Sequence, residues 1–279
     1  QIMLVLLQVN VLMLIVEFYL NKMKQIVVIP ARLNSSRFPN KILFDIKGIP
    51  MIEHVRRRAL LAKEVKDVFI ATCDIEIKEV MNSFGANVIM TSDKHLNGTS
   101  RVAEAVEGID CSEVILVQGD EPLLLPHDLD EMIKNIRKSK NIDAWNATGP
   151  IDYPEELVKH SFVKCAIHND RILYCFRRSP SFNDFKTQKK YIRKILGVIA
   201  FKKEFLLKIT KFNSTPIEKI ESIEQMRIIE KGYTIKSIPF ELSQPSINEP
   251  NEVEEVLNYI SKSIEQQSIL KQVINFNNE

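Results

Sequence analysis

The chain has 279 residues, of which 45% are hydrophobic and 27% are charged, and its formal net charge is +2. A chain of this length and composition can bury a substantial core, either as one domain or as one domain with a small insertion. The near-neutral charge, without a long basic tract, argues against a nucleic-acid partner. The four cysteines lack the CxxC spacing of metal and redox sites, so we expect reduced thiols in a cytoplasmic protein.

The first 22 residues form an apolar leader. Residues 2–20 are almost wholly apolar, and Lys22 and Lys24 follow them. This length suits a transmembrane helix with its positive end in the cytoplasm, whereas the basic start of a signal peptide is missing. The interpretation we favour is that Met23 is the true start and that the leader is not part of the mature protein. Membrane contact is therefore expected only if residues 1–22 are retained.

Apolar strand patterns alternate with amphipathic helical patterns from residue 23 onward. We expect strands at 25–30, 67–72, 87–91, 113–118 and 143–148, and helices near 51–63, 74–84, 98–108 and 127–139. Gly85 is placed to end the second of these helices as a C-cap residue. Such alternation predicts an α/β, Rossmann-like fold with a mainly parallel sheet.

The pattern changes at about residue 160. Two short strand patterns flank an Asn-Asp pair and predict a hairpin over 162–176. A capping-box sequence begins at Thr215, with Pro216 at the first helical position, and predicts one helix that runs to about Lys231.

A strand near 234–240 and a helix near 251–265 are expected to close the domain. We therefore predict one domain over 23–265, with a small β-rich insertion at about 160–200. The polar tail over 266–279 is expected to be frayed.

The loop after the first predicted strand is rich in cations. Arg32, Arg37 and Lys41 lie in it, Pro30 and Pro39 restrict its backbone, and small residues leave room for a ligand. Three cations at the carboxyl end of a central strand can gather around one polyanion such as a triphosphate. A solvated basic loop is the alternative.

A second polar motif, Gln118-Gly-Asp-Glu-Pro, follows the apolar strand predicted at 113–118. Asp120 is thereby placed outside the carboxyl end of a strand, where open α/β sheets bind ligands. Its carboxylate could hold Mg²⁺ against a nucleotide phosphate, whereas a turn or helix-cap aspartate is the alternative. Together with the cationic loop, this motif favours nucleotidyl transfer.

These two motifs make the chain similar to a known family. The pattern Pro-Ala-Arg-x-x-Ser-x-Arg-x-Pro-x-Lys from Pro30 to Lys41, together with 118–122, resembles the sugar-acid cytidylyltransferases, most closely the 3-deoxy-manno-octulosonate (KDO) cytidylyltransferases. Further matches are 95–101, Val163-Lys164, 178–180, 215–218 and 224–227, and the resemblance runs from about Lys24 to Tyr259. It implies a nucleotide-diphospho-sugar transferase fold. It also implies transfer of CMP from CTP to the anomeric hydroxyl of KDO or a related acid, with release of pyrophosphate, for lipopolysaccharide or surface polysaccharide synthesis.

The resemblance also implies roles for individual residues. Those expected around the nucleotide are Ala31, Arg32, Arg37, Lys41, Asn97, Gly98, Thr99 and Gln118, and those expected to be catalytic are Arg32, Lys41 and Asp120. Mg²⁺ is expected on Asp120 and Asn248. Arg178 is expected at the sugar carboxylate, and the protein is expected to be a homodimer with its contact in the 160–200 insertion.

A pair of polar residues on the helix predicted from Thr215 is expected to bind sugar hydroxyls. Glu221 and Gln225 are four residues apart, which would put them on one helix face. Simple surface exposure of this pair is the alternative, as a salt bridge is for Arg178. The resemblance also implies that the segment 95–101 lies around the cytidine, and for Arg101 a helix-surface charge is the alternative.

The chain departs from the family at several of these positions. Asn248 replaces the usual second aspartate ligand, Ser100 replaces a glutamate, and Ile195 and Ile199 replace the usual His and Tyr. Fewer hydrogen bonds in the sugar pocket favour a different or less hydroxylated acid, such as an amino-KDO, a sialic-like or a pseudaminic-like acid. A CTP-binding protein without transferase activity is the alternative from another class. A dinucleotide-dependent oxidoreductase is disfavoured, because no Gly-x-Gly-x-x-Gly follows the first strand.

Overall fold

The computed structural model describes residues 24–35, 37–139, 141–179 and 184–276. The apolar leader over 1–22, with the interpretations of it given above, lies outside these ranges. Within the ranges, every helix is too short or too polar to cross a membrane.

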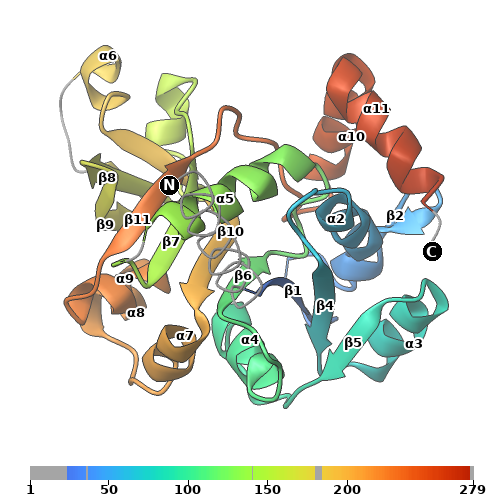
Figure 1. Cartoon of the computed structure of the whole chain (residues 1–279). Coiled ribbons are helices and arrows are strands. Elements are labelled where there is room, and N and C mark those ends of the chain that lie inside the picture. The colour runs from blue at the N-terminus through green and yellow to red at the C-terminus, as the bar shows by residue number, and fades with distance from the viewer. Residues whose placement is uncertain (1–23, 36, 140, 180–183, 277–279) are drawn as a thin grey trace, which may run out of the picture.

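The first half of the chain forms a parallel α/β layer, as predicted (Figure 1). Strands β5 (Asn87–Met90), β4 (Asp67–Thr72), β1 (Gln25–Ala31) and β6 (Glu113–Val117) lie side by side in that order, and every pairing among them is parallel. The crossover helices are α2 (Met51–Leu60), α3 (Ile75–Ser83) and α4 (Gly98–Val106). Gly85 has a φ of 69° just after α3, so the predicted C-cap is confirmed.

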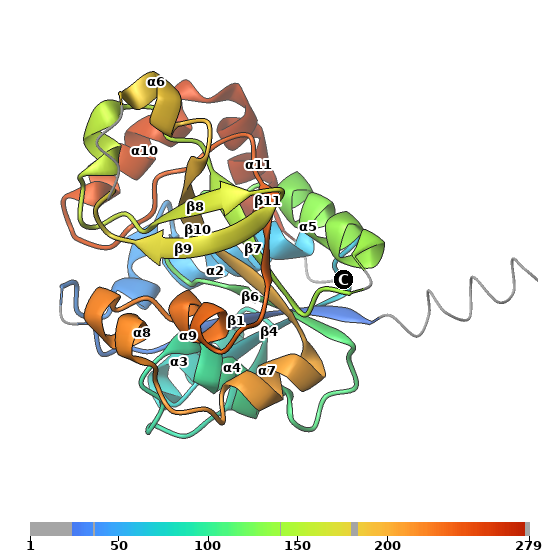
Figure 2. The same ribbon diagram turned by 90° about the vertical axis from the view of Figure 1, so that its left-hand side faces the viewer.

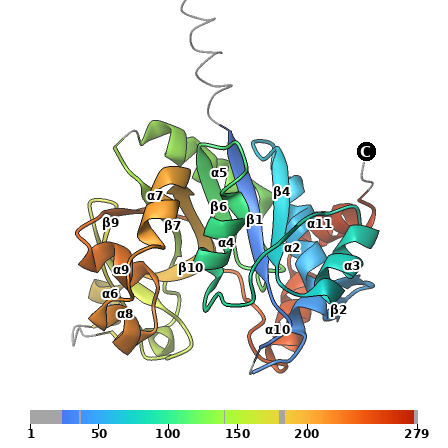
Figure 3. The ribbon, with the colours of Figure 1, turned by 90° about the horizontal axis from the view of Figure 1, so that it is seen from below.

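Strand β1 shows how the sheet is buried on both faces. Val27 and Ile29 pack on the face covered by α2, α3 and α5 (Pro126–Lys138). Ile26 and Val28 point to the opposite face, which is covered by α4 and α7 (Lys203–Ile209). Figure 3 shows α4 and α7 together on that second face. A strand that is buried on both faces needs a continuous apolar run. This run is the reason that β1 could be predicted from its sequence.

The second half of the sheet is mixed. Strand β10 (Ile192–Lys202), which was not predicted, runs antiparallel between β6 and β7 (Ala144–Gly149), and β11 (Ile235–Pro239) is parallel to β7. Arg193, Lys194 and Gly197 interrupt the apolar pattern of β10, so its sequence gave no clear strand signal. The predicted α/β class is confirmed, with its parallel strands concentrated in the first half.

The predicted hairpin is present and closes this half of the sheet (Figure 2). Strands β8 (Lys164–His168) and β9 (Arg171–Phe176) are joined by Asn169 and Asp170, both with positive φ, as a type I′ turn requires. Strand β9 also pairs with β11, and β8 also pairs with β10. Strands β10, β7, β11, β9 and β8 therefore close on themselves at this end of the sheet.

The long helix predicted from Thr215 is instead two short ones. The capping box at Thr215 is confirmed, but α8 (Pro216–Glu221) stops at Ser222, whose φ is 56°. A residue with a left-handed backbone conformation cannot continue a right-handed helix, so α9 (Gln225–Glu230) starts in a new direction.

The frayed tail expected from residue 266 is also wrong. Helix α10 (Glu252–Lys262) agrees with the prediction, and α11 (Ile264–Ile274) follows it and packs on α2. Gln266 is buried and donates to the carbonyl of Leu123 at 2.8 Å, while Arg57 donates to the carbonyl of Val273 at 2.7 Å. The polar residues that suggested fraying therefore hold α11 in place.

The remaining elements are short. They are η1 (Lys41–Leu43), β2 (Asp45–Ile46), β3 (Ile49–Pro50), η2 (Pro154–Leu157) and α6 (Phe185–Gln188).

Candidate active site

Two adjoining cavities lie where the predicted motifs meet. The smaller, of about 330 Å³, is lined by the loop after β1, the start of α4 and the end of β6. The larger, of about 700 Å³, is lined by β10, the α8–α9 region and the segment 242–248. Asn97, Gln118 and Glu224 line both cavities, so ligands in the two would meet at these residues.

The cationic loop forms one wall of the smaller cavity. Arg32, Arg37 and Lys41 all line it, together with Ala31. The loop is held from behind, because the Leu33 amide donates to the Asp74 carboxylate at 2.8 Å. The structure thus brings together three cations that the sequence predicted to surround a polyanion.

Asp120 lies directly opposite Lys41. The Lys41 ammonium donates to the Asp120 carboxylate at 2.6 Å and to the carbonyl of Ile247 at 3.2 Å. The two side chains are only 12% and 22% exposed. The carboxylate and one cation of the site therefore neutralise each other.

The start of α4 forms a second wall of the smaller cavity. The side chain of Asn97 caps the helix by accepting from the Ser100 amide at 2.9 Å. A Cβ on Gly98 would stand 3.0 Å from the ring of Pro30, so glycine permits the close approach of helix and loop. Because a capped helix N-terminus favours anions, this wall adds to the positive potential of the loop.

The structure tests two expectations for residues of α4. Thr99, expected at the nucleotide, lines the larger cavity and not the smaller one. Arg101 lines the smaller cavity, where the resemblance puts the nucleotide, and it is buried and donates to Thr91 at 2.6 Å, so the alternative of a helix-surface charge is wrong. His95 bridges Ser100 and Glu104, which holds the turn before α4.

The donor set at Asp120 suits Mg²⁺. A carboxylate is a hard oxygen ligand, and Mg²⁺ is commonly held by one or two carboxylates together with substrate phosphates. In the described part of the chain, no three His, Cys, Asp or Glu side chains gather as a metal cage. Asp120, beside the cations of a phosphate-sized cavity, fits the mode in which the substrate completes the coordination.

Strand β10 builds the floor of the larger cavity through a bulge. Its register against β7 shifts between Ile195 and Ile199, and both residues line the cavity. At the centre of the bulge, a Cβ on Gly197 would stand 2.3 Å from the Glu121 carboxyl, so any other residue there would displace the Glu121 side chain. Enclosure of Glu121 and the charge of Asp120 raise the pKa of Glu121 to about 8.

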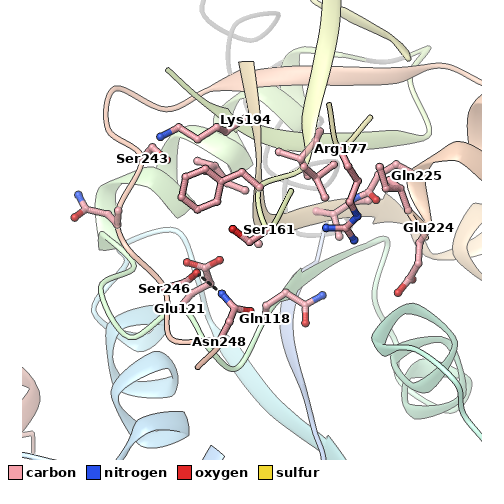
Figure 4. A pocket seen from close by; sticks show the side chains of 18 of the residues that line it. Gln118, Glu121, Ser161, Arg177, Lys194, Glu224, Gln225, Ser243, Ser246 and Asn248 are labelled. Atoms are coloured by element: carbon pink, nitrogen blue, oxygen red, sulfur yellow. Dashed lines mark hydrogen bonds between the residues drawn. The ribbon is translucent and has the colours of Figure 1, made fainter. Parts of the chain in front are cut away.

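The α8–α9 break changes which polar residues reach the larger cavity. Gln225 and Glu224 line it (Figure 4), whereas Glu221 instead accepts from the amide of Arg177 at 3.2 Å. The argument that Glu221 and Gln225 share one helix face is wrong, because the left-handed Ser222 separates them. Glu224 was not predicted as a site residue, although it precedes Gln225 in the motif 224–227 that the chain shares with the family.

The arginine of this cavity is also displaced by one position. Arg177 lines it (Figure 4), whereas Arg178 is exposed and is not among its lining residues. Alternation along the end of β9 sends neighbouring side chains in opposite directions, and strand register cannot be read from a motif alone.

Asn248 faces a different cavity from Asp120. Its amide donates to the hydroxyl of Ser246 at 3.1 Å, and both side chains line the larger cavity near Glu121 (Figure 4). Asp120 lines only the smaller cavity. The two side chains expected to share Mg²⁺ therefore line different cavities, although the amide of Ile247 donates to the carbonyl of Asp120 at 3.2 Å.

Comparisons with known proteins agree with this geometry. The family model described as Cytidylyltransferase matches residues 26–238. The 3-deoxy-manno-octulosonate cytidylyltransferase of Geotalea uraniireducens is 33% identical over 251 residues, 86% of this chain and all of that protein. The 8-amino-3,8-dideoxy-manno-octulosonate cytidylyltransferase of Shewanella pealeana is 33% identical over 230 residues, 81% of this chain and 94% of that protein.

A solved structure gives the same answer at the level of the fold. A CMP:2-keto-3-deoxy-manno-octonic acid synthetase complexed with CTP has a TM-score of 0.80 and 30% identity, covering 86% of this chain and 99% of that one. With a family model that spans most of the chain and relatives that align over nearly their whole length, this chain belongs to the cytidylyltransferase family.

Proposed function

We propose that the protein transfers CMP from CTP to the anomeric hydroxyl of KDO or a related sugar acid and releases pyrophosphate. The observation that carries this proposal is the pair of adjoining cavities that share Asn97, Gln118 and Glu224. A nucleotide in the smaller cavity and a sugar acid in the larger one would meet at these residues. The names of the relatives and the CTP complex of the similar structure support the same pair of substrates.

The smaller cavity is proposed to hold the triphosphate. Arg32, Arg37 and Lys41 would bind its oxygens and stabilise the pyrophosphate that leaves. Gly98 and Gln118 would lie beside the cytidine, where the backbone permits close approach. In the reaction, the anomeric oxygen forms a bond to the α-phosphorus and loses its proton, while the bond from the α-phosphorus to the bridging oxygen breaks.

Asp120 is proposed to hold Mg²⁺ in this cavity. The ion would neutralise phosphate charge and acidify the attacking hydroxyl. Lys41, which pairs with Asp120 at 2.6 Å, would lie beside this ion and the phosphates of CTP.

The larger cavity is proposed to hold the sugar acid. Arg177 takes the place expected for Arg178 at the carboxylate side, and Glu224 and Gln225 are placed to bind hydroxyl groups. Ile195 and Ile199 offer no hydrogen bond, so the face of the sugar toward β10 is expected to be poor in hydroxyls.

An amino-substituted KDO is a second candidate for the acceptor. The larger cavity is lined by several carboxylates, of which Glu156 is already paired with Lys194 at 2.7 Å, whereas Glu255 forms no ion pair within the described residues. An ammonium group on the acceptor could form charge-assisted hydrogen bonds with a carboxylate there, and these are stronger than the bonds that a hydroxyl group would form. One of the similar proteins is named for the 8-amino acid, which is the same chemistry.

Location and assembly belong to the same proposal. CTP is a cytoplasmic substrate, and the four cysteines are free thiols, as expected for a cytoplasmic protein. A homodimer with its contact in the 160–200 insertion is proposed on the resemblance to the family. A monomer mass in light scattering that does not change with concentration would refute the dimer.

Release of pyrophosphate tests the proposed reaction. Protein starting at Met23 would be assayed with CTP, Mg²⁺ and a panel of KDO, 8-amino-KDO and a sialic acid, with ATP and GTP as nucleotide controls. Release with CTP and one acid alone would support the transferase and identify the acceptor. Binding of CTP without release for any acid would favour the CTP-binding alternative that Asn248 suggested.

A further inference from the structure

Lys164 is a buried lysine that bonds to backbone oxygens. Its side chain is inaccessible to solvent, and its ammonium donates to the carbonyls of Lys159 and Phe162, both at 2.8 Å, and to the carbonyl of Arg177. In the parts of the chain that the structure describes, it forms no ion pair. Burying a charge is costly unless hydrogen bonds or a partner compensate it. The three carbonyls compensate the ammonium of Lys164, and this arrangement suggests that the buried lysine has a structural role.

The three carbonyls belong to two segments that wall the acceptor cavity. Lys159 and Phe162 lie in the turn before β8, where Ser161 also lines the cavity, and Arg177 is the first residue after β9. Strands β8 and β9 separate just where the ammonium is placed between them. The ammonium therefore fixes the distance between the two segments beyond the end of their strand pairing.

Arg177 extends this connection to the third wall of the cavity. Its guanidinium donates to the carbonyls of His160, Glu221 and Ser222 at 3.1–3.2 Å. The last two carbonyls belong to the break between α8 and α9 that brings Gln225 to the cavity. A set of hydrogen bonds thus runs from Lys164, through Arg177, to the chain segment that directly precedes Glu224 and Gln225.

We infer that Lys164 is a positioning residue of the acceptor site, which it acts on through Arg177 and the turn at 159–162. The inference rests on the proposed function, since it assigns the acceptor to the larger cavity. Lys164 does not line either cavity and touches no nucleotide-binding residue, so its role is confined to the sugar acid. Loss of its ammonium is expected to weaken acceptor binding and leave CTP binding unchanged.

The charge state of Lys164 gives a second way to test its role in the acceptor site. Burial, aided by the charge of Arg177, lowers the pKa of Lys164 to about 8, although Glu156 and Glu221 act in the opposite direction. A neutral amine has two N–H groups, which cannot serve three carbonyls. The acceptor site of the wild-type protein should therefore loosen as the pH rises above 8.

The test compares Lys164→Met with Lys203→Met. Lys203 is a matched control, because its ammonium also donates to two carbonyls, those of Glu107 and Ile109, but lines neither cavity. We expect Lys164→Met to raise KM for the sugar acid by about tenfold, the effect of losing about one charge-assisted hydrogen bond, with kcat within about threefold of wild type. The Kd for CTP, measured by calorimetry, should not change in either variant.

A wild-type measurement keeps the inference testable if Lys164→Met does not fold. Between pH 7 and 9, KM for the sugar acid should rise while KM for CTP stays level. The rise should persist in Glu121→Gln, which removes the other group of this cavity whose pKa is about 8, and loss of the rise in that variant would overturn the inference. An unchanged acceptor KM in folded Lys164→Met, a parallel rise in both KM values, or a level acceptor KM across this pH range would overturn the inference. Absence of transfer by the wild-type protein itself would refute the proposed function instead.

Discussion

Replacing Asp120 by Asn separates catalysis from stability at the centre of the site. Asn keeps the size of the side chain and one oxygen acceptor, but it loses the charge that Lys41 meets at 2.6 Å. Hydrogen bonds to a charged group contribute about 1.5–3 kcal/mol and neutral ones about 0.5–1.5 kcal/mol. Because both side chains are mostly but not fully buried, the expected loss in the free energy of unfolding is about 1 kcal/mol.

The expected loss of activity is much larger. If Asp120 holds Mg²⁺ on the transferring phosphate, Asp120→Asn should lower kcat by at least about 10³-fold, which corresponds to about 4 kcal/mol. Without Mg²⁺, CTP should bind the variant at least as well as wild type, because Lys41 no longer has a carboxylate partner.

Pyrophosphate release at saturating Mg²⁺ and urea unfolding measure the two effects on the same preparations. Asp67→Asn is a suitable control, because its pair with Lys24 is exposed and lies away from both cavities, so neither quantity should change appreciably. A kcat for Asp120→Asn within tenfold of wild type would refute the metal assignment. A loss of stability as large as the loss of activity would show that the variant fails because it unfolds.

Three further predictions concern single residues. Asn248→Asp should preserve or raise turnover at low Mg²⁺, and a lower rate would show that a second carboxylate does not help the ion. Glu224→Gln should raise the acceptor KM by about tenfold more than Glu221→Gln does, because only Glu224 lines the cavities; equal effects would contradict that placement. Burial lowers the pKa of His54 to about 4, so only the unfolded chain takes up its proton as the pH falls from 6.5 to 5. Urea unfolding should therefore show wild type losing about 2 kcal/mol more than His54→Gln over this range, and equal losses would contradict the burial of a neutral imidazole.

The parallel half of the fold was predictable because each of its signals is local. Strand β6 is a continuous apolar run, and Gly85 ends α3 by its own backbone conformation. Strand β10 was missed because its register, bulge and antiparallel direction depend on β6 and β7, which are distant in sequence. The helix at Thr215 was predicted too long because no local feature of Ser222 requires a left-handed turn.

The site divides in the same way. The charged residues predicted at the nucleotide lie in the segments that follow two adjacent strands, β1 and β6, and the structure brings Arg32, Lys41 and Asp120 to one cavity. Residues predicted for the sugar were chosen by spacing and motif. Of these, Gln225 lines the larger cavity, but Arg178 and Glu221 do not, and their neighbours Arg177 and Glu224 line it instead. An error of one position along a strand end or a helix end reverses where a side chain points.

This division has a consequence for how the acceptor can change. The smaller cavity is built from the capped N-terminus of α4 and from the close approach of this helix to the loop after β1. Many substitutions at neighbouring positions would leave both features intact. The larger cavity takes its floor from a bulge anchored by Gly197 against Glu121, and Ile195 and Ile199 are side chains that this bulge merely presents. If the acceptor occupies this cavity as proposed, substitution at those two positions should alter hydrogen bonding to the sugar without altering the backbone that places it. A scaffold of this kind can therefore keep its specificity for CTP while its specificity for the sugar acid changes. The panel of acceptors in the pyrophosphate assay should for this reason include many different sugar acids.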